Sequence, residues 1–184
     1  MKKYSVIAAL LMMIVSLAAC VPTEKTDIQM APDFSTSDKV IELDFTQIHN
    51  DTIGSFGEVN PYVYIEDLDI SGDNSSKVVN IKATSLDGIE EADAKQFVAA
   101  CMRYINDAAV VQDSKYQVSD STTFGNLWDS FSMHAVVTSH SGETVLDMTV
   151  EKGTEAGLNP DIETYEEEWE KAVEIYNRNH AGED

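Results

Sequence analysis

The stretch from Asp67 to Val78 carries oxygen-bearing side chains at the spacing of a calcium-binding loop. Oxygen atoms are available at positions 1, 3 and 5, and a glycine stands at position 6. Position 12 is Val78, where such a loop has a bidentate glutamate, and alternating apolar residues typical of strands flank the stretch. We therefore expect the turn of a β-hairpin here. A weak cation site built from Asp67, Asp69 and Asp73 is the alternative.

The histidines and the single cysteine beyond residue 20 lack the spacing of a metal or catalytic site. His134 and His140 are six residues apart, roughly 20 Å along a strand, which is too far for one zinc ion. Cys101 stands in an apolar helical stripe and is interpreted as a small buried hydrophobe. The G-x-S-x-G, H-E-x-x-H, C-x-x-C and phosphate-loop motifs are all missing from the sequence. The sequence thus predicts no catalytic residues, no metal and no cofactor, and leaves open an active site assembled from distant residues.

Glutamates crowd the last predicted helix. They are Glu163, Glu166, Glu167, Glu168, Glu170 and Glu174. Like charges four residues apart on a helix repel, so a solvated outer face is the first interpretation. The functional alternative is a docking face for a basic partner, formed by Glu163, Glu167, Glu170 and Glu174.

Trp128 is a second candidate for partner binding. On a regular strand it would share a side with Ser130, Ser132 and His134, and an exposed tryptophan among polar residues suits a ligand platform. A bulge, or coverage by a neighbouring segment, would instead return the indole to the core.

Residues 1–20 have the pattern of a secretion signal. Two lysines follow Met1, an uninterrupted apolar run extends from Val6 to Val15, and small residues close it. The run is about half the roughly 20 residues that a bilayer-spanning helix needs. Leu17-Ala18-Ala19-Cys20 resembles a bacterial lipobox. The resemblance implies that Cys20 receives a diacylglyceryl group and becomes the new N-terminus. An ordinary signal peptide cut after Ala19 is the alternative.

The resemblance also implies an extracytoplasmic location, on the outer leaflet of the cytoplasmic membrane or on the outer membrane of a host that has one. We expect three segments: a lipoprotein signal peptide at 1–19, the lipidated Cys20 with a flexible tether at 20–38, and one domain at 39–184. Removing two lysines with the signal peptide leaves 10 basic against 33 acidic residues, a charge of −23. That charge argues against a nucleic-acid partner, whose binding requires basic side chains.

Periodicity predicts an α+β domain with an antiparallel sheet of about six strands and two helices on one face, in the order βββαβββα. The expected strands are 40–45, 62–70, 78–83, 116–121, 128–138 and 144–151, and the expected helices are 87–109 and 159–179. Similar spacing in the two halves suggests a structural duplication. A curved cystatin-like or NTF2-like sheet is the alternative.

These observations predict a non-enzymatic binding or accessory module at the cell envelope. The membrane, through the N-terminal lipid, and a basic protein or a small ligand are the expected partners. An envelope hydrolase or transferase with a non-local active site is the alternative function.

Overall fold

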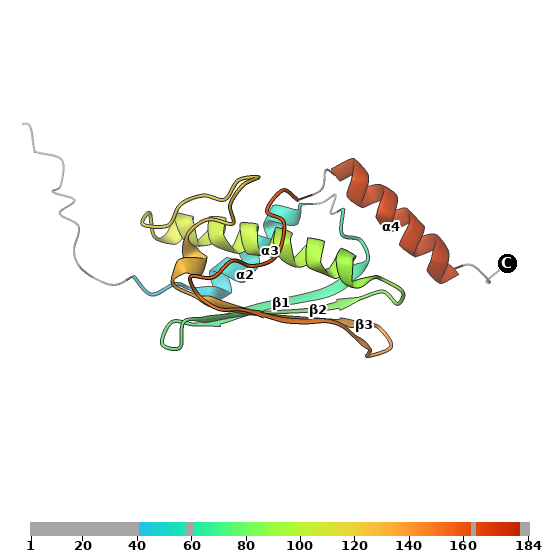
Figure 1. Ribbon diagram of the computed structural model, residues 1–184, viewed down its shortest axis with the longest axis horizontal. Coiled ribbons are helices and arrows are strands. Elements are labelled where there is room, and N and C mark those ends of the chain that lie inside the picture. Colours follow the sequence, from blue (N-terminus) through green and yellow to red (C-terminus); the bar gives the residue numbers. More distant parts are fainter. Residues whose placement is uncertain (1–40, 58–60, 163–164, 181–184) are drawn as a thin grey trace, which may run out of the picture. The chain divides into compact units, whose positions relative to one another are not determined.

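A computed structural model describes residues 41–57, 61–162 and 165–180 of the chain. Cys20, the signal peptide, the tether and Glu163 lie outside these residues. The described part has the predicted α+β class, with three α-helices and a four-stranded sheet. Helices α2 (Phe45–Phe56) and α3 (Glu91–Gln112) lie along one face of the sheet (Figure 1).

The sheet is mixed, with strands in the order β1-β2-β3-β4. β1 (Ile65–Asp73) and β2 (Val78–Ser85) form one antiparallel hairpin, and β3 (Ser132–Ser139) and β4 (Thr144–Val150) form another. β2 and β3 pair in parallel, so α3 is the crossover helix that parallel strands require. The predicted six-stranded antiparallel sheet in the order βββαβββα is therefore wrong, although both hairpins were expected.

Residues 41–45 do not form the first expected strand, 40–45. Asp44 caps α2 instead, since its side chain accepts hydrogen bonds from the backbone N–H groups of Thr46 (2.9 Å) and Gln47 (3.1 Å). The buried residues Ile48, Thr52 and Phe56 then recur every four positions, which gives the helix one face against the core. The turn residues Gly54 and Ser55 lie inside this helix, which ends at Gly57 with a positive φ of 71°.

The prediction of a strand at 116–121 is also wrong. Side chains of α3 form hydrogen bonds with the backbone of this segment in place of a neighbouring strand. Asp107 accepts the Ser119 N–H at 2.7 Å, and Asn106 donates to the Gln117 carbonyl at 2.8 Å. The strand expected from Trp128 begins only at Ser132, and Trp128 lies in a short 3-10 helix, Leu127–Asp129.

Helix α3 has the predicted apolar stripe, all of it buried: Ala94, Phe97, Val98, Cys101, Ile105 and Ala108. Its first turn begins later than expected, because Glu90 and not Asp87 is the N-cap. The Glu90 N–H donates to Asp93 Oδ2 at 3.0 Å. Cys101 is fully buried and unpaired, as predicted, and burial raises the pKa of its thiol.

The last helix, α4 (Tyr165–His180), begins after the expected Asn159 and buries a different face. The apolar pattern predicted a buried stripe of Ile162, Tyr165, Trp169, Ala172, Val173 and Tyr176. Ala172 is buried as predicted and Ile175 joins it in the core, whereas Trp169, Val173 and Tyr176 are 43%, 43% and 55% exposed. Arg178 fixes this orientation by donating from Nη1 to the Gly88 carbonyl at 3.1 Å. Over the described ranges, no helix is long and apolar enough to span a membrane.

Candidate functional site

Two long connections, residues 113–131 and 151–162, meet beside α3 and form a pocket between them. Apart from the 3-10 helix Leu127–Asp129, these two connections contain no helix or strand, and connections of this length are uncommon in compact domains and often carry function. The pocket has a volume of about 380 Å³, in the range of small-molecule sites. We call it the loop pocket. It is lined by Met102, Thr122, Thr123, Phe124, Gly125, Trp128, Asp129, Val150, Thr154, Glu155, Ala156, Gly157, Leu158 and Pro160.

The loop pocket has an apolar floor and a polar rim. Met102, Trp128 and Val150 are buried in the core. Phe124, Ala156, Leu158 and Pro160 are half-buried and form the walls. The exposed rim carries hydroxyls and carboxylates, from Thr122, Thr123, Thr154, Asp129 and Glu155. An apolar floor with a few polar groups at the mouth suits a ligand that has an apolar body and a polar end.

Asn106 in α3 holds the first connection in place. This residue is fully buried, and its Oδ1 accepts the Leu127 N–H at 3.1 Å while Nδ2 donates to the Gln117 carbonyl. Gly125 packs directly over the same carboxamide, where a Cβ atom would overlap it, and has a φ of +81°. The pocket wall is thus fixed by side chains of a rigid helix.

The second connection is tied both to the first and to α3. The Gly153 N–H donates to the Trp128 carbonyl at 2.8 Å. Arg103 donates from Nη1 to the Pro160 carbonyl at 3.3 Å and from Nε to Ser119 Oγ at 3.2 Å. One arginine therefore links α3 to both connections.

Trp128 is a buried residue of the pocket floor and not the exposed platform of the first interpretation. Only 6% of its surface is exposed, so the alternative in which the indole returns to the core is confirmed. No described residue accepts a hydrogen bond from its buried Nε1–H. Packing alone therefore orients the indole, at a cost of about 1–3 kcal/mol for the unpaired donor.

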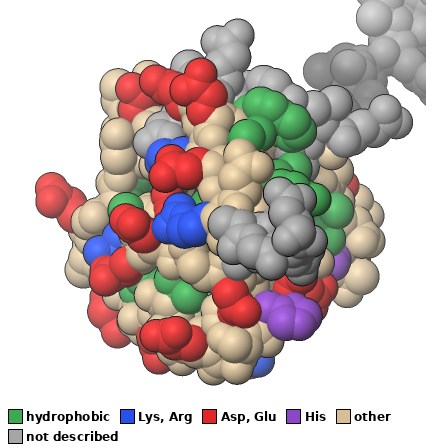
Figure 2. Space-filling view, turned by 90° about the vertical axis from the view of Figure 1, so that its right-hand side faces the viewer, with side chains coloured by type: hydrophobic (Ala, Val, Ile, Leu, Met, Phe, Trp, Pro, Cys, Tyr) green, Lys and Arg blue, Asp and Glu red, His purple; other side chains and the backbone are tan. Residues whose placement is uncertain are grey.

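Three acidic residues of α4 lie on its surface and are not part of the loop pocket's lining. Glu167, Glu170 and Glu174 are exposed, and Glu163 lies outside the described residues. Lys171 lies 3.7 Å from Asp93 of α3. Figure 2 shows the face that includes α4, where acidic side chains outnumber basic ones and hydrophobic side chains are exposed beside them.

Asp67, Asp69 and Asp73 belong to the β1–β2 hairpin. Asp73 Oδ1 accepts the N–H groups of Ser75 (2.6 Å) and Ser76 (3.2 Å), and these backbone hydrogen bonds lower the pKa of its carboxyl. Within residues 41–57, 61–162 and 165–180, no three His, Cys, Asp or Glu side chains are grouped as metal ligands. The β-hairpin expected at this stretch is confirmed.

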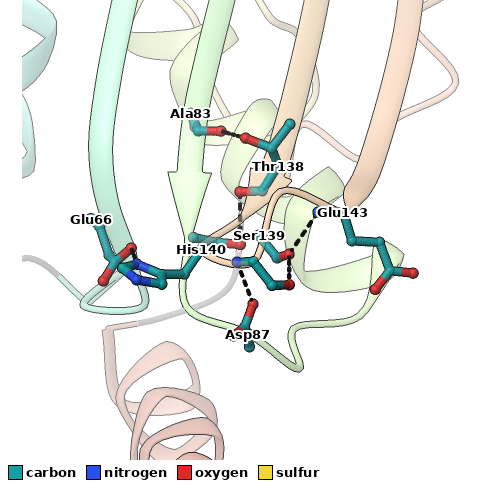
Figure 3. Close-up of polar contacts among 9 residues, drawn as sticks. Glu66, Ala83, Asp87, Thr138, Ser139, His140 and Glu143 are labelled. Carbon is teal, nitrogen blue, oxygen red and sulfur yellow. Dashed lines mark hydrogen bonds and ion pairs between the residues drawn. The ribbon is translucent and has the colours of Figure 1, made fainter.

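A cluster of polar side chains lies at the β3–β4 turn (Figure 3). His140 Nδ1 pairs with Glu66 Oε2 at 2.9 Å, which links this turn to β1. The Ser141 N–H donates to Asp87 Oδ1 at 2.9 Å, and Ser139 Oγ accepts the Glu143 N–H at 3.1 Å. These contacts hold the β3–β4 turn against β1 and against the segment that follows β2.

No family model matches this chain, and neither a curated protein nor a solved structure matches it.

The loop pocket brings together Trp128 and Asp129, whereas His134 lies on the open sheet face, 3.0 Å from Asp147. No local pattern in the sequence predicted the loop pocket. The glycines and threonines in the two long connections are the sequence feature that could have indicated this pocket.

Proposed function

We propose that this protein is a lipid-anchored, non-enzymatic binding module on the extracytoplasmic side of a membrane. We further propose that the loop pocket holds a small organic ligand. This proposal rests on the composition of the pocket, which has a buried apolar floor and a polar rim. The lipobox pattern at Leu17–Cys20 supports the location. Two or more acyl chains on Cys20 would keep the domain on its membrane.

Filling the pocket tests the binding function. Ala156, a half-buried wall residue, changed to Trp should occupy the cavity, while Val118→Trp adds the same side chain at a position 64% exposed and away from the lining. Ligand-observed NMR against a library of small aromatic and aliphatic compounds should give hits with the wild type and with Val118→Trp. Those hits should be lost in Ala156→Trp. Equal hits in all three proteins would contradict binding in this pocket.

Replacing Cys20 tests the anchor. Cys20→Ser should abolish labelling by radioactive palmitate and leave the protein either released from membranes or unprocessed. Cys101→Ala is the matched control, because its thiol is buried in α3 and should not be acylated. Palmitate labelling of Cys20→Ser would contradict the lipoprotein proposal.

A basic protein docking on α4 is the second candidate function. Its supporting observation is that Glu167, Glu170 and Glu174 are exposed on the helix that also exposes Trp169, Val173 and Tyr176. Changing Glu163, Glu167, Glu170 and Glu174 to Gln should weaken capture of such a partner from an envelope extract. A variant with Asp67, Asp69 and Asp147 changed to Asn is the control, since these exposed acids lie on the sheet. An unchanged capture profile of the α4 variant would assign that helix to packing and solubility.

A further inference from the structure

We infer that the loop pocket selects small organic amines, with an apolar body on the floor and an ammonium group at the rim. This inference rests on the proposed binding function and specifies its ligand. It follows from two properties of the pocket that come from different parts of the chain: the burial of the floor and the sign of the charges around the mouth.

The floor favours an apolar body. Met102, Trp128 and Val150 are 1%, 6% and 5% exposed, and come from α3, the 3-10 helix and β4. Burying the apolar part of a ligand against this surface removes it from water, which favours binding. The half-buried ring of Phe124 adds an aromatic wall.

The rim favours a positive charge. Both charged lining residues, Asp129 and Glu155, are acids, and no Lys, Arg or His is part of the lining. Arg103 keeps its positive charge while it donates to the Pro160 carbonyl and to Ser119 Oγ, so the two rim acids outnumber this one base beside the wall. The mouth therefore attracts an ammonium group and repels a carboxylate, and the threonine hydroxyls offer acceptors for its N–H groups.

Three probes of one shape separate charge from apolar fit: phenethylamine, phenethyl alcohol and phenylacetate. Trp128 reports on the pocket by fluorescence once Trp169, the second of two tryptophans, is changed to Phe. In Trp169→Phe protein we expect the amine to bind about fivefold more tightly than the alcohol, and phenylacetate to bind most weakly.

Neutralising the rim should remove this preference. In Trp169→Phe protein that also carries Asp129→Asn and Glu155→Gln, the amine and the alcohol should bind within twofold of each other. A matched control, Glu42→Gln with Glu143→Gln, removes two exposed acids outside the lining and should keep the fivefold preference. Circular dichroism checks that each variant is folded.

The outcomes distinguish the ligand class from the binding function. If amine and alcohol bind equally and Ala156→Trp removes both, the pocket binds ligands without charge selection, and the inference is wrong while the proposed function stands. If the control loses the preference as the rim variant does, the overall charge of the protein explains it and the inference is wrong. If none of the probes binds with saturation, the inference also fails, and the Ala156→Trp library comparison then decides the proposed function.

Discussion

Asn106 shows how much of the loop pocket depends on one side chain. It is completely buried, yet both ends of its carboxamide are used, toward the Gln117 carbonyl and the Leu127 N–H. These bonds replace the strand partner that an extended segment at 116–121 would otherwise need. The position of Trp128 in the pocket floor therefore follows from a polar residue inside the helix.

Changing Gly125 to Ala should cost about 2–4 kcal/mol of unfolding free energy, because the new Cβ would overlap the Asn106 carboxamide at a φ of +81°. Gly142→Ala is the control, since its φ is +87° but no atom lies within 4 Å of the added Cβ. It should cost only the backbone strain, about 1 kcal/mol. Urea unfolding measures both, and equal losses would show that contact with Asn106 contributes nothing.

The Glu66–His140 pair should make stability depend on pH. The hydrogen bond and charge of Glu66 raise the pKa of His140 above its ordinary value of 6.5. A raised folded-state pKa contributes stability that is fully present below pH 6.5 and is lost as the pH rises through the folded-state value.

Wild type should therefore exceed His140→Gln in urea midpoint at pH 5.5, and the difference should shrink by pH 8.5. Glu66→Gln should show the same trend, whereas His134→Gln should keep the Glu66–His140 contribution intact. A difference between wild type and His140→Gln that is independent of pH would contradict this account.

At the scale of elements, the cap of α2 decides between helix and strand. Ile41, Leu43 and Phe45 alternate as a strand does, but Asp44 accepts two backbone N–H groups and starts a helix at Phe45. Asp44→Ala should cost about 1 kcal/mol, while Asp44→Asn, which keeps the accepting oxygen, should cost a few tenths. Thermal unfolding followed by circular dichroism tests the pair, and equal losses would contradict the capping role.

Local signals in the sequence were enough for both hairpins and for α3. Alternation and turn residues predicted β1–β2 and β3–β4, and the apolar stripe predicted which face of α3 is buried. The parallel pairing of β2 with β3 joins residues more than fifty positions apart, such as Asn80 and His134, so no local pattern reports it.

The loop pocket could not be predicted for the same reason. Its lining comes from α3, from residues 122–129 and from residues 150–160, and side-chain hydrogen bonds of Asn106, Asp107 and Arg103 hold the nearby backbone. Trp128 illustrates the difference, since strand periodicity placed it outside and the 3-10 helix turned it inward. Side chains that bond to distant backbone override the local pattern.

At the scale of the whole molecule, charge is the dominant feature. The chain has 33 Asp and Glu residues but only 12 Lys and Arg residues, so at least 21 carboxylates have no Lys or Arg partner of their own. Of the ion pairs among the described residues, Lys95–Glu91 (2.6 Å) and Lys115–Asp113 (2.6 Å) join neighbours in sequence, and Lys171–Asp93 (3.7 Å) joins α4 to α3. Because the acids far outnumber the bases, acids on separate elements repel one another across the surface, and this repulsion opposes the compact state.

Salt should accordingly stabilise the isolated domain. Raising NaCl from 0.1 M to 1 M shortens the Debye length from about 10 Å to about 3 Å, so the melting temperature should rise. Changing Glu167, Glu170 and Glu174 to Gln should add about 0.5–1 kcal/mol of stability at low salt and reduce the rise, because three like-charge pairs at spacings of three or four on α4 are then gone. Lys152→Gln, which removes an exposed base, should increase the rise. A melting temperature that does not change with salt in any of these proteins would show that the acids are too far apart, or too well solvated, to oppose folding.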